Sequence, residues 1–226
     1  MTRETLTKLS IKKQIPLYCV AADVQSAFSR TNRVCLLFEC QLQGEHGKLF
    51  LFSVGFNENT DVILTADGIF SARFSEYCGG AQGSIRAPGA WKVYSVPLAR
   101  MIESSGIGAQ FYGIDFGLAL VADDSLAMTT SEHRFNLMNN IYKRYAQEYD
   151  IIYEYSKLEL NLWGVKDPYI KGEGLNFGGH THSVSRESTH VGVQICQEQK
   201  SSVTQNVNRR LSKTNARTWQ LMAKCW

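Results

Sequence analysis

The sequence predicts an α+β protein in which an antiparallel β-sheet or sandwich packs against one long amphipathic helix. Short runs rich in β-branched and aromatic residues recur between glycine-containing turns in residues 33–122, as expected of antiparallel strands. Apolar residues with helical spacing follow at residues 131–157. No stretch alternates strand and helix as a parallel doubly wound sheet does. With 226 residues, 44% of them apolar, the chain can bury one full core.

The charge distribution predicts three parts. These are an N-terminal arm at residues 1–30, a single α+β domain at residues 31–196 and a basic C-terminal extension at residues 197–226. The net charge of +3 conceals an acidic body between two basic ends. Such ends are commonly solvated, but they also bind nucleic acid or the acidic body of a neighbouring subunit.

The N-terminal half of the predicted domain reads as strands. Residues 33–42 and 48–56 flank a glycine-containing loop and predict a β-hairpin. Further strands are expected at residues 61–65, 69–74, 90–96 and 109–122, and the glycine-rich segment 76–89 reads as a loop.

The predicted helix begins where Thr129 and Glu132 have capping-box spacing. Its apolar face is expected to pack on the sheet. Five of the ten tyrosines lie between residues 142 and 155, and their hydroxyl groups would also suit a contact between subunits. They are expected to titrate near pH 10, and repulsion between the ionised side chains would then dissolve an assembled form in alkali. The five are Tyr142, Tyr145, Tyr149, Tyr153 and Tyr155.

Three of the five histidines lie in the Gly/Ser/Thr-rich stretch 178–194. On a strand, His180 and His182 would point to the same side, with His190 and Cys196 as further metal ligands. The stretch has no CxxC, HExxH or carboxylate cluster beside it. The sequence therefore predicts a surface loop that holds no metal and leads into a strand at residues 189–196.

Cys78 is the candidate nucleophile, because a glycine-rich turn can expose a thiol and offer backbone N–H groups to an oxyanion. His133 or His190 would then be the base. The alternative is a cysteine beside a turn with no chemical role.

Three acidic residues, Asp115, Asp123 and Asp124, end an apolar strand and could hold a divalent cation. Since the sequence identifies no partner carboxylate, the interpretation favoured here is a turn at residues 123–124.

Several features predict an intracellular, cytoplasmic protein without a cofactor. No apolar run approaches the roughly 18 residues that cross a bilayer, and lysines interrupt the N-terminus where a signal peptide is apolar. The six cysteines are scattered without a CxxC pair and read as reduced thiols, mostly buried.

The order of elements resembles that of the cypovirus polyhedrins. The elements are a basic arm, the predicted hairpin, the segment KVYSVPLARM at residues 92–101, the strand GLALVADD at residues 117–124, the tyrosine-rich helix and a final strand STHVGVQ at residues 188–194. The resemblance implies a structural protein that assembles with itself into crystalline occlusion bodies around virions. It carries over no nucleotide-binding residue, because the middle of this chain is shorter and the basic tail is extra.

The predicted function is therefore a self-assembling structural protein, with two alternatives left open. One is an intracellular cysteine-dependent enzyme or effector built around Cys78. The other is a nucleic-acid-binding protein that uses the basic tail, whose affinity would fall steeply with salt.

Overall fold

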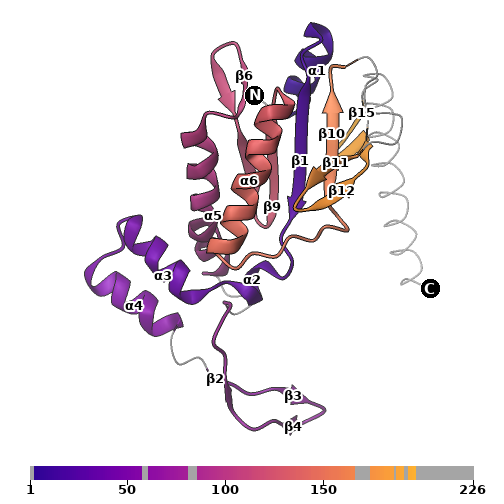
Figure 1. Ribbon diagram of the computed structural model, residues 1–226. Helices are drawn as coiled ribbons and strands as arrows, with labels where there is room; N and C mark the ends of the chain where they lie inside the picture. The colour runs from indigo at the N-terminus through magenta and orange to yellow at the C-terminus, as the bar shows by residue number, and fades with distance from the viewer. Residues whose placement is uncertain are drawn as a thin grey trace, which may run out of the picture.

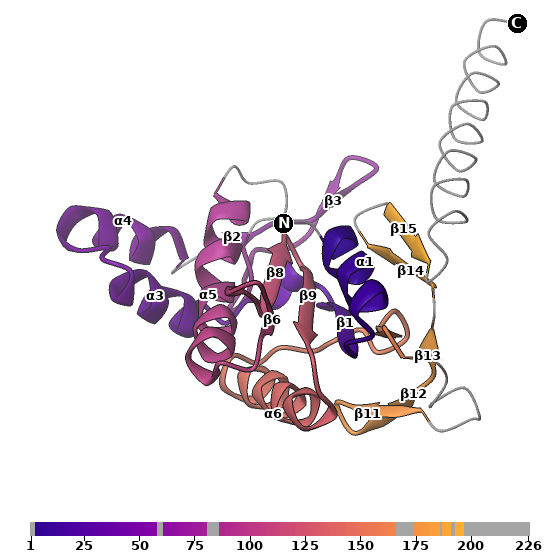
Figure 2. The same ribbon diagram turned by 90° about the horizontal axis from the view of Figure 1, so that it is seen from above.

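A five-stranded sheet with helices on both faces forms the centre of the protein (Figures 1 and 2). The computed structural model describes residues 3–57, 61–80, 86–165, 174–185, 187–190 and 193–196. The strand order is β13-β10-β1-β9-β8, and all neighbours are antiparallel except β10 and β13. The strands are β1 (Leu17–Asp23), β8 (Leu118–Val121), β9 (Asp124–Thr129), β10 (Glu159–Trp163) and β13 (Val184–Ser185).

Strand β1 lies in the middle of this sheet, so the expectation of an arm over residues 1–30 is wrong for residues 17–23. Its side chains alternate between two cores. One set, Tyr18, Val20 and Ala22, packs in the larger core. The other set packs in a smaller core on the opposite face: Leu17, Cys19 and Ala21. Because both faces are covered, residues 17–22 of the strand show no polar alternation, and only its last residue, Asp23, is charged.

Two helices, α5 (Ala87–Ser105) and α6 (Glu132–Glu148), cover the face of the larger core, and α1 (Arg3–Lys13) covers the other (Figure 2). Two long helices therefore pack on this face of the sheet, where the sequence predicted one. In the described residues, helices rather than a second sheet cover the faces, so this part of the chain is not a sandwich. Helix α6 begins at Ser131, whose hydroxyl accepts the Arg134 N–H, rather than at Thr129. It ends at residue 148, so residues 149–157 are not part of it.

The strand expected at residues 90–96 is the first half of α5. Pro88 in the first turn favours a helix start. Buried residues then recur with helical spacing at Trp91, Tyr94 and Leu98.

The hairpin expected at residues 33–56 is also wrong. This segment forms α3 (Arg33–Leu42) and α4 (Gly47–Asn57). The Asn32 side chain accepts hydrogen bonds from the Val34 and Cys35 N–H groups and so caps α3. Burial at Arg33, Leu36 and Cys40 follows a helical period, which the aromatic and β-branched content had hidden.

The remaining strands are short and pair as two-residue to four-residue hairpins beside the main sheet. The pair β3–β4 forms a finger that projects away from the sheet (Figure 1). The predicted strand 109–122 is three strands separated by turns. The strand expected at residues 189–196 is a hairpin of β14 and β15. Their bounds are β2 (Asp61–Val62), β3 (Thr65–Ala66), β4 (Ile69–Phe70), β5 (Phe74–Ser75), β6 (Ala109–Phe111), β7 (Ile114–Phe116), β11 (Leu175–Phe177), β12 (His180–His182), β14 (Glu187–His190) and β15 (Val193–Cys196).

No helix in the described part of the chain is both long enough and apolar enough to cross a membrane. Residues 197–226, the predicted basic extension, lie outside the described residues.

Candidate functional site

Acidic residues on two adjacent strands lie at the end of the sheet beside α2 (Ala27–Arg30), where β1 ends and β9 begins (Figure 1). Asp23 is the last residue of β1 and lies directly opposite Asp124, the first residue of β9, in the antiparallel register. Asp123 precedes Asp124 in the turn that joins β8 to β9. Asp123 and Asp124 therefore do have a partner carboxylate, one that lies 100 residues earlier in the chain.

The turn between β8 and β9 consists of Ala122 and Asp123, since Val121 pairs with Asp124. Ala122 has φ of 53°, in the left-handed region that residues other than glycine seldom adopt. Its carbonyl oxygen accepts a hydrogen bond of 2.7 Å from the indole N–H of Trp91. This turn places two consecutive acidic residues at the strand end.

A lysine neutralises part of this charge. Lys157 donates from Nζ to Oδ2 of Asp23 at 2.9 Å. This hydrogen bond, together with the charge of Asp23, raises the pKa of Lys157. The lysine is brought there by the segment after α6, whose Glu154 N–H donates to the Asp23 carbonyl oxygen at 2.9 Å.

The donor set fits a hard cation such as Mg²⁺, which prefers carboxylate oxygens. Among the described residues, no three His, Cys, Asp or Glu side chains lie close enough together to hold a metal ion. Asp23 instead faces Lys157, so a cation would compete with the ammonium group for this carboxylate. A complete protein cage is not required, because Mg²⁺ at phosphoryl-transfer sites uses one or two carboxylates plus substrate phosphates.

Asp115, the third acidic residue of the predicted group, is not in this cluster. It lies on β7 in a separate hairpin, where the amide of Gln110 donates to its carboxylate at 3.4 Å.

The predicted cysteine site is not assembled by the described residues. Cys78 is exposed and contacts the carbonyl oxygen of Ser29, with Sγ 3.6 Å away. His133 is exposed in the first turn of α6. No hydrogen bond links Cys78 to His133 in the described structure, and the side chain of His190 lies outside it. A nucleophilic role for Cys78 stays a prediction.

The prediction of reduced, mostly buried thiols agrees in part with the other described cysteines. Cys19 and Cys40 are buried and Cys35 is half-buried, all as free thiols. Burial raises the pKa of Cys40 to about 11, so this thiol stays protonated near neutral pH. Cys225 lies outside the described residues.

His180 and His182 belong to strand β12 rather than to a loop. Their rings gather around Tyr155, with ring centroids 4.7 Å and 6.1 Å from the tyrosine ring. Burial lowers the pKa of His182, which favours its neutral form. The side chains of His190 and Cys196, the other ligands considered, are not described, and the absence of a shared metal stays a prediction.

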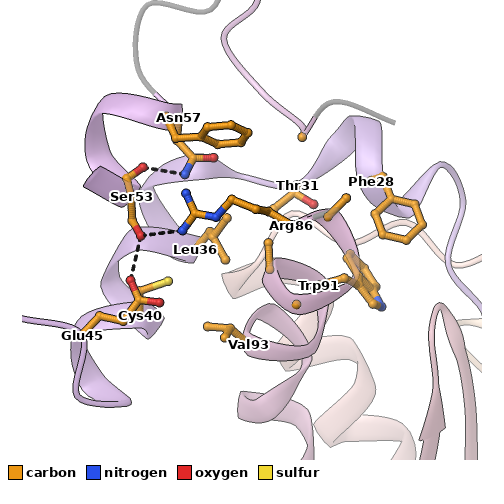
Figure 3. A pocket seen from close by; sticks show the side chains of 15 residues that line it. Phe28, Thr31, Leu36, Cys40, Glu45, Ser53, Asn57, Arg86, Trp91 and Val93 are labelled. Carbon is orange, nitrogen blue, oxygen red and sulfur yellow. Dashed lines mark hydrogen bonds between the residues drawn. The ribbon is translucent and has the colours of Figure 1, made fainter. Parts of the chain in front are cut away.

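A cavity of 330 Å³ lies between α3, α4 and the start of α5 (Figure 3). At one end, Arg86 lies over the rings of Phe52 and Phe56, 4.7 Å and 5.0 Å from their centroids. Arg86 donates to Ser53 Oγ at 3.2 Å, and that hydroxyl donates to the Glu45 carboxylate at 2.8 Å. The opposite wall includes Phe28 and Trp91, and the indole N–H of Trp91 donates to the Ala122 carbonyl oxygen in the turn before Asp124.

Comparisons with known proteins find likeness in fold only. No family model matches the sequence, and no curated protein matches it. An apo telomerase from Candida tropicalis truncated from its C-terminal domain matches with a TM-score of 0.61 and 14% identity, over 86% of this chain and 37% of that one. The apo telomerase of the same species gives 0.57 and 13%, over 86% and 34%. Its complex with a TWJ fragment of telomeric RNA gives 0.57 and 12%, over 87% and 32%.

These values establish a shared fold. The match spans about a third of the length of each telomerase chain. None of the three structures bears on the resemblance to polyhedrins, which stays a prediction.

Proposed function

We propose that this chain is a metal-dependent nucleotidyl-transfer domain that extends a nucleic acid strand, as a polymerase does. The observation that carries the proposal is the register of β1 and β9, which sets Asp23 opposite Asp124 with Asp123 beside it. Carboxylates of this kind hold the paired metal ions of polymerases and nucleases. The fold shared with telomerase chains favours the polymerase reaction over the nuclease one.

The chain's own residues have distinct roles in this proposal. Asp23, Asp123 and Asp124 would hold Mg²⁺, which supplies charge neutralisation at the transferring phosphoryl group. Before a cation binds, Lys157 keeps the carboxylates from repelling one another by pairing with Asp23. The tight turn at Ala122 fixes the spacing of the two consecutive aspartates.

Nucleic acid is the proposed partner. One of the similar structures holds a fragment of telomeric RNA, which supports RNA as the first template to test. The basic tail remains a possible phosphate-binding segment, but the proposal does not depend on it.

Primer extension tests the proposal directly. The wild-type chain should add nucleotides to a primer on an RNA or DNA template in the presence of Mg²⁺ or Mn²⁺. The substitutions D23N, D123N and D124N remove the negative charge at nearly constant shape. Each should lower the extension rate by at least about a hundredfold, since one charge-stabilising group is typically worth that much.

D115N is the matched control, because Asp115 belongs to a different hairpin and should extend like the wild type. An inactive wild-type chain on every template with both metals would refute the proposed function. So would full activity of D123N and D124N.

We also propose, as a second candidate, that the chain associates with itself. Helices α3 and α4 and the β3–β4 finger leave large apolar side chains exposed, and patches of this kind mark interaction surfaces. The most exposed are Val34, Leu51, Ile69 and Phe70. Analytical ultracentrifugation over a range of concentrations tests it, and a monomer at every concentration would exclude self-assembly, including a lattice around virions.

A further inference from the structure

We propose that Trp91 is a positioning residue of the carboxylate cluster. Its indole N–H holds the turn that bears Asp123 and Asp124, and its ring holds the segment that follows Asp23. This inference rests on the proposed nucleotidyl-transfer function and adds to it a group that would touch neither metal nor substrate.

The hydrogen bond from Trp91 reaches the turn at Ala122, the residue with the unfavourable backbone conformation. Trp91 is only 4% exposed, and Nε1 lies 2.7 Å from the Ala122 carbonyl oxygen. Ala122 has a left-handed backbone that an L-residue adopts only when its surroundings impose it. Fixing the carbonyl fixes the peptide plane between Ala122 and Asp123, and with it the backbone from which Asp123 projects.

The same side chain contacts the other strand end. The ring of Trp91 lies 6.1 Å from that of Phe28, in the short helix α2 that follows β1 and Asp23. On its other side it lies 5.6 Å from the ring of Tyr94, also buried in α5. One rigid, buried side chain thus links both carboxylate-bearing segments to a long helix.

Electrostatics makes such support necessary. Carboxylates held close together repel one another, so the backbone that carries them needs support. Lys157 offsets part of this repulsion through its ion pair with Asp23. The hydrogen bond from Trp91 adds backbone support to the turn that carries the other two aspartates.

The test removes the N–H and keeps an aromatic ring. In W91F the turn loses its hydrogen bond, and we expect roughly a ten- to hundredfold loss in Mn²⁺ affinity and in kcat for nucleotide addition, as for other residues that support metal ligands. KM for the primer–template should stay unchanged, because Trp91 is buried. Mn²⁺ binding is measured by electron paramagnetic resonance without nucleic acid, so one readout does not depend on activity.

W163F is the matched control. Trp163 is also fully buried, on β10, and its indole nitrogen has no hydrogen-bond partner among the described residues. Both variants lose the same volume and should unfold at similar temperatures, but W163F should bind Mn²⁺ like the wild type. A122G is the rescue: glycine adopts the left-handed conformation freely, so W91F/A122G should recover much of the Mn²⁺ affinity that W91F loses.

The outcomes distinguish a failure of this inference from a failure of the proposed nucleotidyl-transfer function. If the wild type extends primers and W91F matches W163F in both Mn²⁺ affinity and kcat, Trp91 is a packing residue only and the inference is wrong. If W91F binds Mn²⁺ weakly and W91F/A122G binds it no better, then Trp91 does not act through the turn. The inference is again wrong in that case. If the wild type neither binds Mn²⁺ nor extends primers, the proposed function fails and the inference fails with it.

Discussion

At the scale of single residues, Arg33 joins three segments that are distant in sequence. Its guanidinium group donates to the carbonyl oxygens of Asn57, Glu76 and Gly79, and it pairs with the Glu76 carboxylate at 3.4 Å. The side chain is only 10% exposed. A buried arginine with this many acceptors holds the end of α4 and the segment after β5 against the start of α3.

We expect R33K to lower the free energy of unfolding by about 3 kcal/mol, because lysine cannot reproduce the planar fork and leaves buried carbonyl groups without donors. Urea denaturation measures this. R73K is the matched control, since Arg73 and Asp61 form an exposed ion pair beside the paired strands β2 and β5, and such pairs contribute less than about 1 kcal/mol. Equal losses in the two variants would contradict the role given to Arg33.

Lys157 allows a second residue-scale prediction. Because its ammonium group competes with a cation for Asp23, K157M should strengthen Mn²⁺ binding in the absence of nucleic acid. The raised pKa of Lys157 keeps its ammonium group charged through neutral pH, so the competition applies at the pH of the measurement. Isothermal titration with Mn²⁺ tests this, with K143M on the exposed face of α6 as the control. Weaker binding in K157M would show that the lysine orients Asp23 rather than competing for it.

At the scale of elements, helical periodicity predicts a helix at residues 131–157, of which residues 132–148 form α6. The turn expected at residues 123–124 lies one residue earlier, at residues 122–123. Composition alone misleads at α3, α4 and α5, where aromatic and β-branched residues suggest strands. In α3 and α5, however, the buried residues recur every three or four positions. Period is the better signal, because it reports which face is buried.

Some residues of the candidate site have a local sequence signal, and others are revealed only by tertiary contacts. Asp123 and Asp124 stand out in sequence because they end an apolar run. Asp23 also ends an apolar run, LYCVAAD, and that is the local signal that could have found it. The register that sets Asp23 opposite Asp124 is a tertiary contact between residues about a hundred apart, which no local pattern contains. Trp91 could not be identified for the same reason, since its partner is a backbone carbonyl group.

Asn139 shows how α6 holds a neighbouring element. Its amide oxygen accepts the Gly178 N–H at 2.9 Å, and its amide nitrogen donates to the Asn176 carbonyl oxygen at 3.4 Å. Both partners belong to the β11–β12 hairpin and its turn. N139A should destabilise the chain by about 1–3 kcal/mol and speed hydrogen exchange at Gly178, because a buried donor and acceptor lose their partner. N140A, on the exposed side of the same helix, is the control and should change neither. Unchanged exchange in N139A would mean that the hairpin is held by its apolar residues alone.

At the scale of the whole molecule, the tyrosine-rich face belongs to the larger core and not to a contact between subunits. Tyr142, Tyr145 and Tyr153 are buried in that core together with residues of the central sheet. Burial raises the pKa of each of the three well above the usual value near 10. For Tyr149, burial and the hydrogen bond that its hydroxyl donates to Glu39 act in the same direction. The expectation that these groups titrate near pH 10 on an assembly surface is therefore wrong.

Alkali should consequently unfold the chain rather than merely separate copies of it. A phenol whose pKa is raised in the folded state contributes stability that is fully present below the unfolded value, near pH 10, and is lost as the pH rises above it. Several buried tyrosines act together, so the transition should be cooperative. We expect tyrosinate absorbance at the buried positions and loss of the far-ultraviolet helix signal to occur in one step above about pH 10. The chain in concentrated guanidinium, which has no folded core, should instead titrate gradually around pH 10 without a step. If light scattering falls in alkali while the helix signal stays intact, these tyrosines lie at a contact between copies, and the assignment of this face to the core is wrong.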